Sequence, residues 1–158
     1  GDLDSDDESG GPNFHASDAC NRATQATYDA NPKWEGSHKY VARGTYIEGL
    51  RAGDACVVKW FKSGPVYSEA DFDHDIAAIS ETKRIAAAFN DAVRPSKPVY
   101  VNEAQVWHHL AEEDRRKVLV EPLIKGVYQH FNSNTGFQAD GFEIMSALSH
   151  FSYYFTGG

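Results

Sequence analysis

Lys59 is the residue whose setting most strongly suggests chemistry. It lies inside the apolar run ACVVKWF, and strand-like alternation places it on one face with Val57 and Phe61. Burying an ammonium group among apolar side chains is costly unless an anion accompanies it. The pattern alone favours the simpler alternative, in which the aliphatic stem covers apolar surface and the ammonium reaches water. The functional hypothesis is that something negative lies beside Lys59.

The second candidate is the end of the apolar segment KVLVEPLI, where Glu121 precedes Pro122. The chain should leave its sheet there, with edge N–H and C=O groups able to meet a flat heteroaromatic ligand. Because proline has no N–H, the nearest donors belong to Leu123 and Ile124. Spacing alone favours an ordinary strand end.

Three further groups carry weaker signals. Glycines within residues 44–53 could bring backbone N–H groups close to a phosphate, with Arg51 as a charge partner, but their spacing matches neither known phosphate-binding glycine motif. Asn132 and Asn134 could contact a metal or a hydroxyl group, although their local sequence is typical of a tight turn. His150 has no second metal ligand three or four residues further on.

These candidates depend on a sheet and helices to position them. Two β-branched and aromatic runs flank the turn sequence GLRAGD, which predicts a hairpin over residues 39–62. Ser68 and Asp71 resemble a capping box, and apolar residues at helical spacing predict a helix over residues 68–91. The prolines of RPSKP, residues 94–98, should end it.

The second half of the chain predicts shorter elements. We expect a short helix at about residues 103–110, a solvated loop at 112–116, a strand ending at Pro122, and a last helix over about residues 142–154. Strands followed by a long helix and a further strand indicate an α+β fold with an antiparallel sheet.

Length and charge limit the class of protein. The chain has 158 residues, 41% of them hydrophobic, and no apolar run long enough to span a membrane. Six acidic residues and no Lys or Arg lie in residues 1–21, so we expect an acidic tail over residues 1–20 and a nearly neutral domain that does not bind nucleic acid. Cys20 and Cys56 make no disulfide framework, which favours a reducing, cytoplasmic location.

Taken in order, three segments resemble the atypical alpha-kinase family, particularly its fungal-type members: GTYIEGLRAGDACVVKWFKSG, VLVEPLIKGVYQHFNSNTGF and MSALSHFSYYFTGG. The resemblance covers about residues 39–158. It implies a partial alpha-kinase domain over residues 21–158, comprising a protein-kinase-like N-lobe, a hinge and the first C-lobe helix. It also implies ATP as a ligand and the Ser or Thr of a protein as phosphate acceptor.

The resemblance also assigns roles to single residues. Lys59 matches the lysine that holds the ATP phosphates, and Glu121 matches the hinge glutamate. Leu123 and Ile124 match the adjoining backbone that contacts adenine. Several family members have an arginine where this chain has Ile47, so we expect Arg51 to supply the corresponding phosphate contact.

The resemblance also implies metal ions, but most of the residues that bind them in the family are not matched in this sequence. Asn132 and Asn134 match an asparagine-rich turn with a supporting role, and His150 matches one zinc ligand of the family. The other Zn²⁺ ligands, and the D-x-Q-G motif that supplies a catalytic Asp and a Mg²⁺-binding Gln, have no counterpart in these 158 residues. The resemblance therefore implies little phosphorylation by this chain alone.

Two other classes of function stay open at this point. The chain could be a kinase-derived scaffold that has lost catalysis and binds a protein partner. It could also be a plain nucleotide-binding or structural domain unrelated to kinases.

Overall fold

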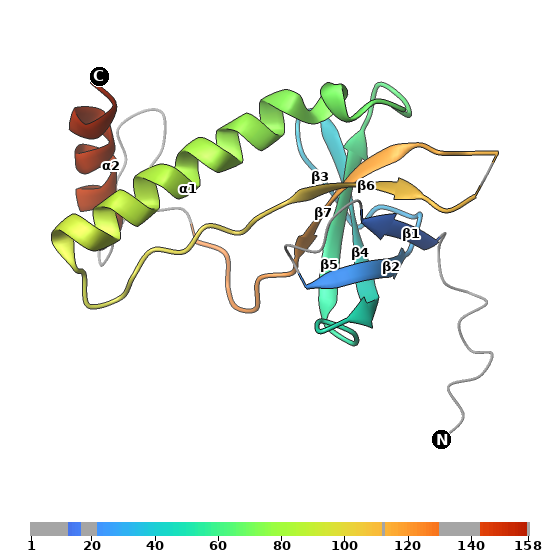
Figure 1. Ribbon diagram of the computed structural model, residues 1–158, viewed down its shortest axis with the longest axis horizontal. Coiled ribbons are helices and arrows are strands. Elements are labelled where there is room, and N and C mark those ends of the chain that lie inside the picture. Colours follow the sequence, from blue (N-terminus) through green and yellow to red (C-terminus); the bar gives the residue numbers. More distant parts are fainter. Residues whose placement is uncertain (1–12, 17–21, 112, 130–142, 158) are drawn as a thin grey trace. The chain divides into compact units, whose positions relative to one another are not determined.

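The computed structural model describes residues 13–16, 22–111, 113–129 and 143–157. These residues fall into two compact units, one drawn from residues 1–76 and 102–124 and the other from residues 77–101 and 125–158. The elements in chain order are β1 (Asn13–Ala16), β2 (Ala23–Tyr28), β3 (Trp34–Glu35), β4 (Lys39–Gly49), β5 (Ala55–Phe61), a 3₁₀ turn (Glu69–Phe72), α1 (Asp73–Val93), β6 (Gln105–His109), β7 (Lys117–Pro122) and α2 (Glu143–Thr156) (Figure 1).

The strands form one antiparallel sheet in the first unit, in the order β2-β1-β6-β7-β5-β4-β3. β2 pairs with β4 as well as with β1, so the sheet curls round and closes on itself. One edge of β4 is shared: β3 pairs with its first half and β2 with its second half. The predicted α+β fold with an antiparallel sheet is confirmed.

The core lies on one face of the curled sheet. Alternate residues of β4, β5, β6 and β7 meet there, and the largest fully buried side chains of this cluster are Trp107 and Tyr46, whose ring centroids are 5.9 Å apart. Cys56 and Val58 of β5 point into the same core with no exposed surface. This alternation leaves Lys59 on the opposite face of β5, as the sequence predicts.

The predicted hairpin and long helix are confirmed. β4 and β5 pair over seven residues on each strand, from Lys39 opposite Phe61 to Thr45 opposite Ala55. The Ser68 hydroxyl accepts a hydrogen bond from the Ala70 N–H at 3.2 Å, which caps the 3₁₀ turn that leads into α1.

The short helix expected over residues 103–110 is wrong, because this segment contains β6. Hydrogen-bonding strands flank it on both sides, β1 and β7. Its inward positions are Gln105, Trp107 and His109, all buried. Two of these three residues are polar, so the alternation of burial does not show as an alternation of hydrophobicity.

The expected tail also differs in part from the structure. Residues 13–16, at the end of the range 1–20 assigned to it, form β1 between β2 and β6. Residues 1–12 and 17–20 of that range lie outside the described residues.

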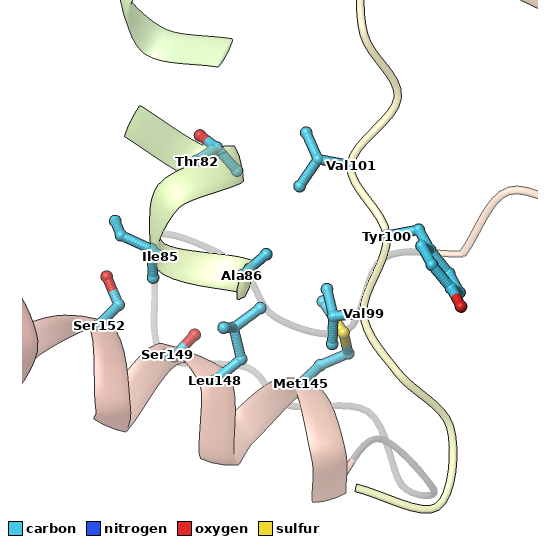
Figure 2. Close-up of a pocket in the computed structure, with 10 residues that line it drawn as sticks. All are labelled: Thr82, Ile85, Ala86, Val99, Tyr100, Val101, Met145, Leu148, Ser149 and Ser152. Atoms are coloured by element: carbon cyan, nitrogen blue, oxygen red, sulfur yellow. The ribbon is translucent and has the colours of Figure 1, made fainter. Parts of the chain in front are cut away.

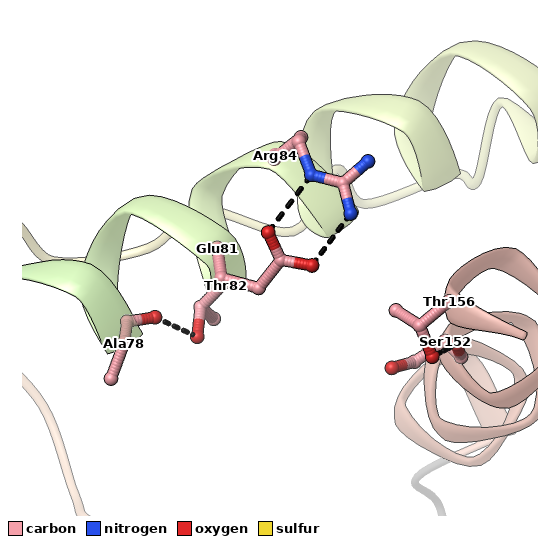
Figure 3. A network of polar contacts seen from close by, with 6 residues as sticks. All are labelled: Ala78, Glu81, Thr82, Arg84, Ser152 and Thr156. Atoms are coloured by element: carbon pink, nitrogen blue, oxygen red, sulfur yellow. Dashed lines mark hydrogen bonds and ion pairs between the residues drawn. The ribbon is translucent and has the colours of Figure 1, made fainter. Parts of the chain in front are cut away.

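The second unit contains most of α1 and all of α2, which confirms the predicted last helix. Phe89 of α1 packs edge-on against Phe151 of α2 at 5.6 Å between centroids, and the Arg84 guanidinium lies 4.8 Å from the centroid of the Phe155 ring. Arg84 is also held by two hydrogen bonds to Glu81 (Figure 3).

A cavity of about 500 Å³ lies within this second unit. Ile85, Met145 and Leu148 are among its apolar lining, and Ser149 and Ser152 of α2 also line it (Figure 2). No helix among the described residues is long and apolar enough to cross a membrane.

Candidate functional site

Lys59 and Glu121 form an ion pair, with 2.7 Å between Nζ and Oε1. The pairing register explains the contact: Lys59 lies opposite Leu119 and Val57 lies opposite Glu121 on the neighbouring strand. These four side chains therefore share the face of the sheet that is opposite the core. Val57 and Leu119 keep only 8% and 3% of their surface exposed, so the two charges lie on an apolar floor.

The ion pair supplies the anion that the sequence requires beside Lys59, and the anion is a carboxylate of the chain itself. The side chains remain 32% exposed for Lys59 and 18% for Glu121. An ammonium has three N–H donors, so donors remain for a second anion that arrives from solvent. Partly exposed ion pairs are weak, and a phosphate could therefore share or take over the ammonium at little cost.

β7 ends at Pro122, which lies opposite Cys56, so the chain leaves the sheet one residue after Glu121, at the strand end that the sequence predicts. The Leu123 N–H donates to the Ala55 carbonyl at 3.0 Å, and the Pro122 carbonyl accepts from Asn102 Nδ2 at 2.8 Å. Ile124 follows with 71% of its surface exposed. Of the two expected donors, the Ile124 N–H has no hydrogen-bond partner among the described residues, whereas a ligand could use the Leu123 N–H only by opening its bond to Ala55.

Arg51 lies at the glycine-rich turn between β4 and β5. The Arg51 guanidinium forms an ion pair with Asp54, at 3.6 Å, and its backbone N–H donates to the Arg22 carbonyl. The Arg51 Nε atom is buried without a hydrogen-bond partner in the described structure, as is the Tyr46 hydroxyl. A phosphate contact by Arg51 stays a prediction.

The core behind this site contains titratable groups that the sequence analysis missed. The Tyr28 hydroxyl and His109 Nε2 are 3.0 Å apart and both residues are buried. Burial raises the pKa of Tyr28 to about 12 and lowers the pKa of His109, which Arg116 lowers further. Burial also raises the pKa of the Cys56 thiol to about 12, so this thiol is protonated and unreactive at neutral pH.

Three expected site residues lie outside the described part of the unit that contains Lys59. Asn132 and Asn134 lie outside the described residues. His150 is on α2 in the second unit, where its ring packs edge-on against Tyr154 at 5.0 Å. Across the described residues there is no group of three or more His, Cys, Asp or Glu side chains that could hold a metal ion. None of the expected site residues that the structure describes lines the cavity of the second unit.

Comparison with models of protein families shows to which family the chain belongs. The model of the alpha-kinase family matches residues 34–158, which include the ion pair, the strand end and α2. The chain belongs to the alpha-kinase family. The resemblance stated from the three sequence segments is thereby confirmed. A comparison with curated protein sequences gave no match.

Solved alpha-kinase structures share the fold of this chain at low sequence identity. The inactive alpha-kinase domain of myosin-II heavy chain kinase A complexed with ATP is 16% identical, with a TM-score of 0.68 over 98% of this chain and 77% of that one. The same domain in complex with AMP-PNP is 16% identical, with a TM-score of 0.69 over 94% and 74% of the two chains. The complex with ADP is 17% identical, with a TM-score of 0.69 over 94% and 73%. These similarities confirm the kinase-like N-lobe fold.

Proposed function

We propose that this chain is the ATP-binding portion of an alpha-type protein kinase that transfers the γ-phosphate of ATP to Ser or Thr of a protein substrate. One observation carries the proposal: in a chain of the alpha-kinase family, the Lys59–Glu121 ion pair lies directly before the exit from the sheet at Pro122. The solved alpha-kinase structures of similar fold are complexes with ATP, AMP-PNP or ADP, which supports a nucleotide as the ligand of this chain.

The proposed division of labour follows from the charges and the backbone. Lys59 binds the phosphates, because its ammonium is partly exposed and its resident partner is a single carboxylate. The backbone at Leu123 and Ile124 meets the base, beyond the strand end. Glu121 keeps the ammonium on the apolar floor when no phosphate is present, which reduces the ordering needed on binding.

The described residues form no complete site for the metal ions that the family implies. Mg²⁺ neutralises phosphate charge in phosphoryl transfer. No group of three or more potential ligands stands together among the residues that the structure describes, and His150 alone cannot complete a tetrahedral Zn²⁺ site. No step of the reaction is therefore assigned to a metal held by these residues.

The test is titration calorimetry with ATP and Mg²⁺ on three proteins: the unsubstituted chain, Lys59→Met and Lys62→Met. Lys62 is a matched control, because it also forms an ion pair, with Glu35 at 2.9 Å, and has 31% of its side chain exposed. We expect Lys59→Met to raise Kd about tenfold, the effect of losing roughly 1.4 kcal/mol. Lys62→Met should change Kd by less than about twofold, since the Lys62 ammonium is paired with Glu35 outside the proposed site and its longer-range effect is screened by salt.

Equal losses in both variants would show that only net charge matters, and would contradict a phosphate site at Lys59. Absence of ATP binding by the unsubstituted chain would reject the proposed function and favour the scaffold alternative. The transfer step needs its own assay, in which labelled ATP and the complete protein should give phosphoserine or phosphothreonine and no phosphotyrosine.

A further inference from the structure

The peptide group that joins Pro122 to Leu123 is held at both ends. Its C=O accepts a hydrogen bond from Asn102 Nδ2 at 2.8 Å, and its N–H donates to the Ala55 carbonyl at 3.0 Å. Because a peptide group is planar and rigid, two opposed hydrogen bonds fix its rotation about the chain. The direction of the backbone at the strand end is therefore set by Asn102 on one side and by β5 on the other.

The Asn102 side chain supplies the hydrogen bond that a neighbouring strand would otherwise donate to the Pro122 carbonyl. β6 reaches only to Gln105, which lies opposite Val120, so no residue of β6 lies opposite Pro122. Pro122 has no N–H of its own, but its C=O still needs a donor. The half-buried Asn102 side chain supplies that donor from the segment just before β6.

The clamped peptide lies between the two parts of the proposed nucleotide site. Glu121, on one side, holds Lys59 through the 2.7 Å ion pair, and Ile124, on the other side, carries an N–H that has no hydrogen-bond partner among the described residues. Rotation of the clamped peptide would redirect the backbone that follows it and leave the ion pair in place. Asn102 thus acts on the base side of the site and not on the phosphate side.

The position of Asn102 in the chain adds to this argument. Residues 102–124 form one continuous segment of the first unit, and the chain enters that unit at Asn102 and leaves it after Ile124. The hydrogen bond from Asn102 to Pro122 therefore joins the entry of this segment to its exit. Loss of the bond would free the exit while the paired strands β6 and β7 stay intact.

We propose that Asn102 is a positioning residue for nucleobase recognition, acting through the peptide between Pro122 and Leu123. This inference rests on the proposed function, because it requires that a nucleotide bind at the strand end. It makes a specific claim within that function: removing the Asn102 amide should weaken binding of the base without weakening binding of the phosphates.

The test compares Asn102→Leu with Asn90→Leu. Leucine is close to asparagine in shape but has no donor. Asn90 is a matched control, since its side chain also holds backbone, donating to the Val99 carbonyl at 2.8 Å and accepting from the Val99 N–H at 2.9 Å, but in the second unit. Affinity is measured for ATP and for inorganic tripolyphosphate, both with Mg²⁺, and hydrogen exchange is measured at the Leu123 amide.

We expect Asn102→Leu to raise Kd for ATP roughly fivefold, the usual effect of one lost hydrogen bond, and to leave Kd for tripolyphosphate within about twofold. The Leu123 amide should exchange faster in this variant only. An unchanged Kd for ATP, an equal loss for ATP and tripolyphosphate, or unchanged exchange at Leu123 would each overturn the inference. If Asn102→Leu does not fold, the same measurements on Asn102→Asp, which keeps the side-chain shape but cannot donate the hydrogen bond, are judged by the same outcomes. Failure of the unsubstituted chain to bind ATP is the separate outcome that rejects the proposed function itself.

Discussion

The Lys59–Glu121 ion pair is partly buried, and its ammonium can still be reached by a second anion. The apolar floor of Val57 and Leu119 removes water from one side of the pair, and the exposed side leaves the ammonium open to a second anion. A fully buried pair would cost more to desolvate and would exchange partners less easily. The degree of exposure therefore suits a site that binds and releases a charged ligand.

The burial of His109 makes stability depend on pH. Burial keeps the pKa of His109 below its ordinary value of 6.5, and Asp114 offsets this only in part. The neutral imidazole is therefore favoured in the folded state, while the unfolded chain takes up a proton near pH 6.5. Stability is complete above that pH and is lost as the pH falls below it.

We expect the free energy of unfolding to decrease as the pH falls below about 6.5, with a slope of at most about 1.4 kcal/mol per pH unit, the limit for one proton. Urea unfolding at a series of pH values measures this. His109→Gln should flatten the slope, and the same substitution at the exposed His74 should not. A slope that survives His109→Gln would assign the proton to another group.

At the scale of elements, Gly44 is the point where three strands are packed most closely. It lies opposite Tyr28 of β2 and opposite Cys56 of β5. A Cβ atom at this position would lie 2.5 Å from the Thr27 carbonyl oxygen and 2.9 Å from Cys56 Sγ. The first of these neighbours is backbone in a paired strand, so it cannot move aside without disturbing the sheet.

Gly44→Ala should lower the free energy of unfolding by about 2–4 kcal/mol, in the range of severe overpacking. Gly36→Ala is the control, because the nearest atom to its added Cβ, the Lys39 carbonyl oxygen, is 3.9 Å away. Chemical denaturation of both variants measures the difference. Similar values for the two would mean that β2 and β4 can separate locally without loss of stability.

The elements also show what the sequence could predict. β5, β7 and α1 have strong apolar patterns and clear end signals, so their positions and the face of Lys59 followed from periodicity. β6 was missed because it buries Gln105 and His109, and β1 because only its pairing with distant strands stabilises four residues. Asn102 was missed because its role depends on where β6 begins relative to Pro122, which is a property of the register.

At the scale of the whole molecule, the two units differ in how much they bury. β5 and β7 each contain three consecutive buried residues, whereas α2 has no buried residue. α2 is held in the second unit chiefly by ring contacts such as that between Phe89 and Phe151. Local opening needs little free energy where few apolar groups are buried.

Amide hydrogen exchange should therefore be faster in α2 than in β5 and β7, by about tenfold or more, because each 1.4 kcal/mol of difference in opening free energy is a factor of ten. Exchange followed by mass spectrometry measures this for each segment. Phe151→Ala should accelerate exchange in α2 further and leave β5 and β7 unchanged. Equal acceleration in the strands would show that the two units open together.

The closure of the sheet through β2 has a consequence for association between copies of the chain. Strands with free backbone groups can recruit other chains into intermolecular sheets, and proteins with open sheets need charges or prolines to prevent it. Here β2 occupies the side of β4 that β3 leaves free, and β1 joins it to β6. Among the described strands, only the two residues of β3 offer an open edge, which is too short to template a growing fibril.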